Sequence, residues 1–306
     1  MKADSPAIAA APFSVGYGTN GFADHSLDDA VTVLRHFGYA GLALTLGFQH
    51  LDPFAADCDR QADRVRQLIG DWPLVIETGT RFLLDPFVKH RPTLVDEHAT
   101  ARLDFLAAAI GVAARTRADC VSLWSGTVPV GEDPERCWDR LVERMQRVTE
   151  QAVAAGVRLA FEPEPGMLVE TVGDALELRD RLGNPEVLGI TVDLGHCVAV
   201  EPDGVVGALR QAGGLLCNVQ VDDMLPGVHE HLELGTGELD LVAALRTLVE
   251  IGYTGLIALE LPRHSHDAPG LAARSMAALD EAWLRLEPHE KVSEPAARLA
   301  PERRQP

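Results

Sequence analysis

Acidic and amide side chains stand at the ends of four successive apolar segments in the second half of the chain. Glu162 directly follows the segment 157–161, and Asp193, Gln220 and Glu260 hold the equivalent place in three later segments. Neighbouring side chains of an extended strand point to opposite faces. When the large apolar side chains of these segments face one way, the four polar side chains all face the other way. The alternation therefore predicts that the four converge.

Three carboxylates that share one axis repel one another unless a proton or a cation neutralises them. Carboxylate and amide oxygens favour a hard divalent ion, so we expect Mn²⁺ or Mg²⁺, with Co²⁺ or Zn²⁺ as the less favoured ions. The predicted ligands are Glu162, Asp193, Gln220 and Glu260. The competing interpretation is four unrelated polar strand ends. Glu164 is left open as a supporting residue or a surface residue.

Short β-rich segments alternate with amphipathic helical patterns from residue 13 onward, and several of the helical patterns stop at glycine. This alternation predicts an α/β protein with one closed (β/α)₈ TIM barrel over 13–286, between disordered ends at 1–12 and 287–306. A doubly wound open sheet is the alternative, supported only by the glycines of 16–21. The expected strands are 13–18, 41–47, 73–79, 120–126, 157–163, 188–196, 215–223 and 255–262.

A long loop follows the third expected strand, and its basic residues include Arg81, Lys89 and His90. Long loops at this end of a barrel strand often carry function. The cluster is either an anion clamp for a phosphate or carboxylate of the substrate, or a solvated loop paired with its own aspartates. Aromatic residues near strand ends could pack on a sugar-like ring or simply line the barrel: Tyr17, Phe48 and Trp124.

The amino-acid composition limits which kinds of molecule the protein is expected to bind. The 306 residues carry a formal net charge of −19, which repels nucleic acid and anionic membrane surfaces. Five scattered cysteines without a CxxC pair suit a reducing compartment, and we find neither a signal-peptide pattern nor an apolar run of about 20 residues. We therefore expect a cytoplasmic protein that acts on a small molecule, and we leave a homo-oligomer open.

The motifs FEPEP, VDLGH, NVQVDD, HEHLELGTGELD and ALELP resemble the xylose isomerase-like barrel family of sugar isomerases and epimerases, from about residue 13 to 285. The resemblance implies that Glu162 and Glu260 hold a metal and move the substrate proton. Gln220 stands where the epimerases have histidine, which leaves the metal's identity open.

The same resemblance implies further site residues. His196 matches a family histidine that contacts the substrate or a second metal, and Asp222 shares the inward parity of Gln220. His229 and His231 fall where endonuclease IV carries an aspartate and a histidine for an extra zinc; a solvated loop is the alternative. We group these four with Arg81, Lys89, His90 and Trp124 as substrate-binding candidates.

The implied reaction removes a proton next to a carbonyl and passes through a cis-enediolate of a sugar, keto-polyol or sugar phosphate. A dehydratase or lyase would use the same base and then expel a hydroxyl. A metal-dependent phosphoesterase of the endonuclease IV type would instead activate water at His196, His229 and His231. The endonuclease itself is disfavoured because the second and third expected strands lack its histidines. A non-catalytic barrel is the remaining alternative.

Overall fold

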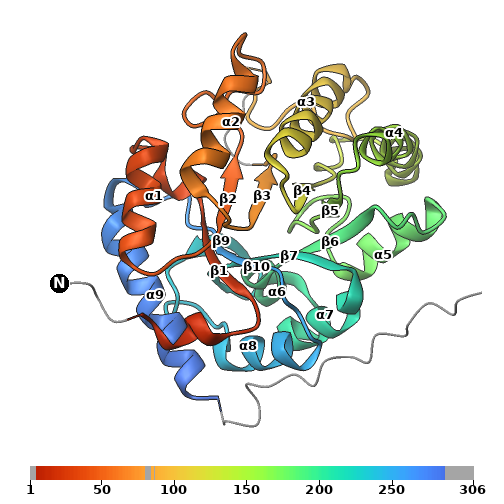
Figure 1. The fold of residues 1–306 in the computed structure, drawn as a ribbon. Coiled ribbons are helices and arrows are strands. Elements are labelled where there is room, and N and C mark those ends of the chain that lie inside the picture. Colours follow the sequence, from red (N-terminus) through yellow and green to blue (C-terminus); the bar gives the residue numbers. More distant parts are fainter. Residues whose placement is uncertain (1–4, 80–83, 86, 287–306) are drawn as a thin grey trace, which may run out of the picture.

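The computed structural model describes residues 5–79, 84–85 and 87–286 and shows a closed barrel of eight parallel strands (Figure 1). Around the barrel the strands follow the order β1-β10-β7-β6-β5-β4-β3-β2, so each strand pairs with its neighbours in the chain and β10 closes the ring against β1. The predicted (β/α)₈ fold is confirmed. The barrel strands are β1 (Ser14–Gly18), β2 (Leu42–Thr45), β3 (Leu74–Glu77), β4 (Cys120–Leu123), β5 (Leu159–Phe161), β6 (Leu188–Asp193), β7 (Leu216–Val221) and β10 (Leu256–Leu259).

Helices surround the barrel and connect its strands (Figure 1). Their ends follow local sequence signals: Asp133 caps α4 by accepting from the backbone of Glu135, and Gly156 ends it with a left-handed φ of 66°. The helices are α1 (Leu27–His36), α2 (Cys58–Ile69), α3 (Thr100–Thr116), α4 (Pro134–Ala155), α5 (Val172–Arg181), α6 (Leu194–Val200), α7 (Gly204–Ala212), α8 (Leu241–Glu250) and α9 (Ala268–Leu284), with single 3₁₀ turns η1 (Ala7–Ala10), η2 (Thr19–Phe22), η3 (Gly213–Leu215) and η4 (Ser265–Asp267). Within the described residues, no helix is both long and apolar enough to span a membrane.

Two apolar layers confirm the predicted alternation along the strands. Large side chains such as Phe161 and Val221 belong to the core between barrel and helices, whereas Ala160 and Ala258 belong to a separate cluster inside the barrel. Asn218 of β7 donates to Glu77 of β3 at 3.1 Å, between strands on opposite sides of the ring. The inward set of each strand therefore meets at the barrel axis.

The sequence predicts a strand over 188–196, but in the structure strand β6 ends earlier, at Asp193. The Asp193 side chain accepts from the backbone N–H of His196 at 3.0 Å and so begins helix α6. A second departure is the hairpin of β8 (Asp223–Leu225) and β9 (Val228–Leu232), because the sequence predicted no strand beyond Asp223 in this part of the chain. The Asp223 side chain accepts hydrogen bonds from the backbone N–H groups of Gly235 and Leu239, which ties the segment after β9 back to the start of the hairpin.

Residues 7–10, inside the segment expected to be disordered, form η1. Ile8 is buried there, and its N–H donates to Asp280 of α9 at 2.8 Å. The expected disordered tail, 287–306, lies outside the described residues. Tyr17 is fully buried against Phe22 and Tyr39, which favours a core residue over a sugar contact, the two interpretations that the sequence left open.

Candidate metal centre and active site

The barrel ladder itself turns both predicted catalytic glutamates inward. The N–H of Glu162 bonds to the carbonyl of Leu123, and the N–H of Glu260 bonds to the carbonyl of Val221, so each residue extends its strand's pairing by one position. Glu162 and Glu260 are 4% and 6% exposed, and Asp193 is 1% exposed. All of them lie at the carboxyl end of the barrel, where the active sites of this fold form.

Asp193 and Gln220 lie directly opposite each other on β6 and β7, and Gln220 is also paired with Ala258 of β10. Gln220 is 3% exposed. The four predicted ligands therefore come from strands that adjoin in the ring in the order β5, β6, β7 and β10.

Hydrogen bonds hold one oxygen of each glutamate. The Ser122 hydroxyl donates to Glu162 Oε2 at 3.1 Å, and the Asn20 amide donates to Glu260 Oε1 at 2.9 Å. In the part of the chain that the structure describes, the buried atoms here that have no hydrogen-bond partner include Asp193 Oδ2, His196 Nε2, Gln220 Oε1 and Glu260 Oε2. Buried polar atoms of this kind are costly unless something compensates them. A divalent cation fits this donor set.

Burial raises the pKa of Glu162 well above its ordinary value, and Glu164 and Glu260 add to the effect by repulsion. Burial raises the pKa of Glu260 in the same direction. Burial would also raise the pKa of Asp193, but the neighbouring His196 and His231 outweigh it and lower that pKa. The protein alone thus favours protonated glutamates, and a cation would favour their ionised form.

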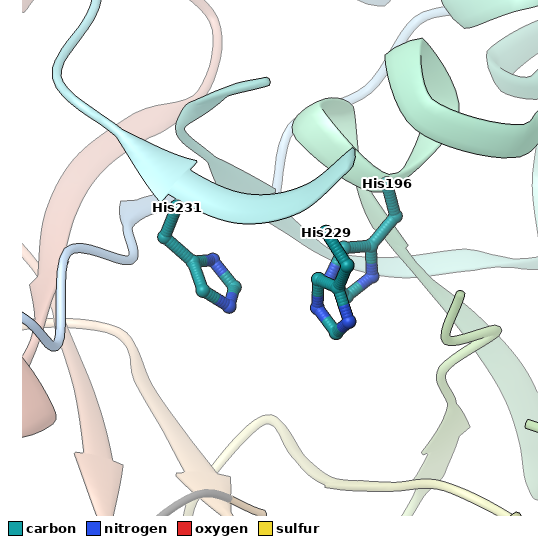
Figure 2. Close-up of side chains that lie close together, drawn as sticks. All are labelled: His196, His229 and His231. Carbon is teal, nitrogen blue, oxygen red and sulfur yellow. The ribbon is translucent and has the colours of Figure 1, made fainter. Parts of the chain in front are cut away.

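Three histidines meet beside this carboxylate group. Figure 2 shows the imidazoles of His229 and His231, carried by β9, next to that of His196 on α6. Their ring centroids are 4.8 to 5.6 Å apart. Each ring offers a nitrogen that lies within 4.8 Å of the others, a spacing that could hold a metal ion.

Two further groups with the same spacing join the histidines to the carboxylates. Glu162 and Asp193 form one with His196, and Asp193 and Asp222 form another with His231. Glu260 belongs to no such group within the described residues. The closest clustering of potential ligands therefore lies on the histidine side of the site.

Neighbouring groups fix the orientation of two rings. His196 Nδ1 lies 3.2 Å from the carbonyl of Pro163, which leaves Nε2 for another partner. Burial lowers the pKa of His196 to about 4, so this ring is neutral and suited to metal binding. His231 Nδ1 contacts the carboxylate of Asp222, which has no exposed surface.

Gly195 permits the burial of Asp222, because a Cβ there would lie 1.8 Å from Asp222 Oδ1. Asp222 contacts His231 and is not among the residues that line the pocket, and its predicted contact with the substrate stays a prediction. Sequence reasoning undervalued Glu164, which is 8% exposed and lies 3.7 Å from His229 and 3.9 Å from His196. Its place two residues beyond Glu162, just after a strand whose inward parity was already known, was the available signal.

A pocket of about 850 Å³ opens above the carboxylates and histidines. Three of the predicted substrate-binding residues from loops line it, namely Lys89, His90 and Trp124, together with Glu164, His229 and His231. Burial lowers the pKa of His90 to about 4, so this ring adds no positive charge near neutral pH. Arg81 lies outside the described residues.

Arg102 of α3 is a supporting residue that the sequence did not reveal. It is 3% exposed, donates to the backbone carbonyls of Thr78, His90 and Pro92, and packs over the Trp124 ring at 4.7 Å. One buried guanidinium therefore holds both His90 and Trp124 against the pocket.

The chain belongs to the xylose isomerase-like TIM barrel family, which it matches over residues 31–282. It is 28% identical to the L-ribulose-5-phosphate 3-epimerase UlaE of Shigella flexneri, over 80% of this chain and 87% of that protein. An uncharacterized protein of Methanocaldococcus jannaschii is 30% identical, but the match spans 45% of this chain and 46% of that protein. The structure of an L-ribulose 3-epimerase has the same fold, with a TM-score of 0.70 at 20% identity, covering 89% of this chain and 96% of that one.

Proposed function

We propose that the protein is a divalent-metal-dependent isomerase or epimerase of a sugar, keto-polyol or sugar phosphate. One observation carries the proposal: Glu162 and Glu260 are buried at the carboxyl end of the barrel, beside Asp193 and Gln220, with polar atoms that lack a partner among the described residues. The named relative, an L-ribulose-5-phosphate 3-epimerase, belongs to the same reaction class.

Glu162, Asp193, Gln220 and Glu260 would hold the ion, and their oxygen donors favour Mn²⁺ or Mg²⁺. When bound, such an ion polarises a carbonyl and the adjacent hydroxyl, which acidifies the carbon between them. The ion would also favour the ionised form of the glutamate that acts as the base, despite its burial.

Glu162 and Glu260 would transfer the substrate proton. They stand on β5 and β10, which are separated in the ring by β6 and β7, so they approach a bound substrate from different sides. Ser122 and Asn20 hold one oxygen of each glutamate in place. In an epimerisation one ionised glutamate takes the proton next to the carbonyl, and the other, in its protonated form, gives its own proton to the opposite face of the enediolate.

Pocket residues would bind the rest of the substrate. His229 and His231 line the pocket beside the carboxylates, and Trp124, over whose ring Arg102 packs, lines it as well. Aromatic faces pack well against the apolar faces of sugar rings.

A metal-dependent phosphoesterase is the second candidate, and the histidine cluster favours it. A metal at His196, His229 and His231 would supply activated water there instead of a polarised carbonyl. A dehydratase would share the proton abstraction by Glu162 or Glu260 and differ by expelling a hydroxyl.

Metal analysis of the purified protein, followed by deuterium wash-in from heavy water, separates these functions. The substrates are a panel of ketoses, inososes and their phosphates. Exchange at the carbon next to the carbonyl, with the hydroxyls kept, is the expected result for an isomerase or epimerase. Loss of a hydroxyl after exchange indicates the dehydratase. Phosphate release without exchange would contradict the proposal and support the phosphoesterase.

A further inference from the structure

Lysine is rare in this chain and occurs only at positions 2, 89 and 291, against 24 arginines. Lys89 is therefore the one lysine in the part of the chain that the structure describes, and it lies at the pocket. Arg263 lines the same pocket from the loop after β10. Two cations thus border the pocket from loops that follow separate strands of the ring.

Among the described residues, several exposed arginines pair with carboxylates, whereas Lys89 does not. Exposed arginines such as Arg64, Arg115 and Arg181 each lie within 2.7 Å of a carboxylate oxygen. Lys89 forms no ion pair with any described residue and is exposed. In a chain with a net charge of −19, an unpaired cation at a pocket is an available anion partner.

Arg263 keeps capacity for a ligand. Its Nη1 atom donates to Glu230 at 2.7 Å, and its side chain is 52% exposed. A guanidinium has five N–H donors, so a single ion pair leaves most of them free for an incoming anion.

His229 connects the two cations to the candidate metal centre. It lines the same pocket as Lys89 and Arg263. His229 itself lies 4.8 Å from His196, measured between ring centroids. A molecule seated over the histidines therefore lies within electrostatic reach of both cations.

We infer that the substrate of the proposed reaction carries an anionic group, a phosphate or a carboxylate, and that Lys89 and Arg263 bind it at the pocket mouth. The reacting carbonyl would then point down toward Glu162 and Glu260. This inference rests on the proposed function and narrows its substrate class. The anion's charge is offset at the mouth, away from the buried carboxylates that would repel it.

The first test is kinetic. Deuterium wash-in is measured with a ketohexose, the corresponding ketohexose 6-phosphate and a ketohexuronate, for the metal-loaded protein and its Lys89→Ala and Arg263→Ala variants. The anionic substrates are expected to have the higher kcat/KM, and each substitution is expected to reduce the ratio of anionic to neutral kcat/KM by about 10- to 100-fold. The better of the two anions identifies the group.

Arg210→Ala is the matched control. Arg210 has a similar exposed side chain, 59%, and a similar single ion pair, with Glu250 at 2.9 Å, but it lies on α7 outside the pocket lining. The ratio should not change in this variant. An equal ratio in the Lys89, Arg263 and Arg210 variants would overturn the inference while leaving the proposed reaction intact.

The second test needs no turnover. Trace acetylation with acetic anhydride, read by peptide mass spectrometry, compares Lys89 with Lys2 and Lys291 as internal references. Inorganic phosphate or the ketohexose 6-phosphate should slow acetylation of Lys89 severalfold, and the neutral ketohexose should not. Equal protection of the three lysines would overturn the inference. Selective protection in a protein that exchanges no ketose would remove the proposed reaction and leave the anion site standing.

Discussion

The two ends of the barrel interior are built from the same strands but have opposite chemistry. Toward the amino end the interior is filled by small or apolar side chains, namely Ala43, Val75, Cys120, Ala160, Cys217, Leu256 and Ala258. Toward the carboxyl end the same alternation brings in Glu162, Asp193, Gln220 and Glu260. An ordinary core position and a buried carboxylate are only two positions apart in the chain, as Ala160 and Glu162 show.

This difference means that the two ends contribute oppositely to the stability of the fold. Apolar burial at the amino end is favourable without further partners. Burial of several carboxylates at the carboxyl end is unfavourable until protons or a cation neutralise them. The amino end therefore stabilises the barrel, and the carboxyl end depends on bound protons or a cation for neutralisation.

The largest expected effect is on catalysis at the carboxyl end. Glu162→Gln and Glu260→Gln should each reduce kcat by about 10²–10⁴-fold, because an amide keeps an oxygen for a metal but cannot accept a proton. Initial rates and metal content are measured for each variant.

Glu250→Gln on α8 is the control for this comparison, because Glu250 lies in the helix ring outside the pocket lining. If both site variants keep their metal and near-normal turnover, the two-glutamate mechanism fails. The histidine cluster would then be the better candidate for the reaction centre.

A carboxylate introduced at the amino end should lower the free energy of unfolding and should not create a metal site. Ala160→Asp places a charge where Ala160 is fully buried among apolar side chains, and we expect a loss of about 3–5 kcal/mol in the free energy of unfolding. Urea denaturation measures it, with the exposed Ala154→Asp on α4 as control. A Mn²⁺-dependent recovery of stability in Ala160→Asp would contradict the contrast between the two ends.

Stability should also fall with rising pH in the metal-free protein. Burial raises the pKa of both Glu77 and Glu164 from 4.5 to about 7. The folded state thus binds more protons than the unfolded state between about pH 4.5 and 7. The stabilisation is complete below that window and is lost as the pH rises through it.

Thermal unfolding from pH 5 to 8 checks this sign. We expect a decrease of about 1–3 kcal/mol per group across the window, smaller where the groups are coupled. Glu77→Gln should remove part of the decrease. A Tm that rises over this range without metal would contradict the expected protonation of the buried carboxylates.

The smallest expected effect concerns metal preference. Gln220→His replaces an amide oxygen with an imidazole, so relative affinity should shift toward Zn²⁺ or Co²⁺ over Mg²⁺, by about tenfold or more. Competition titration of the two proteins measures it, with Asn218→His as the comparison one layer deeper in β7. An unchanged order of preference would remove Gln220 from the ligand set.

Much of the framework followed from the sequence. The alternation of apolar and polar residues in the strand containing Phe161 and Glu162 predicted the inward carboxylates, and the eight repeated units predicted the closed barrel. Ligand roles and the identity of the metal stay predictions. The sequence pattern missed the β8–β9 hairpin, which lies outside the repeated strand–helix units.

The sequence by itself determined which side chains face the barrel axis, because side-chain direction along a strand is a local property of the extended backbone. Only the tertiary structure decided which groups meet. Barrel closure sets Asn218 against Glu77, the hairpin brings His229 and His231 to His196, and two loops place Lys89 and Arg263 on one pocket. Those contacts join residues far apart in the chain, and they depend on ring closure and loop paths that no local pattern encodes.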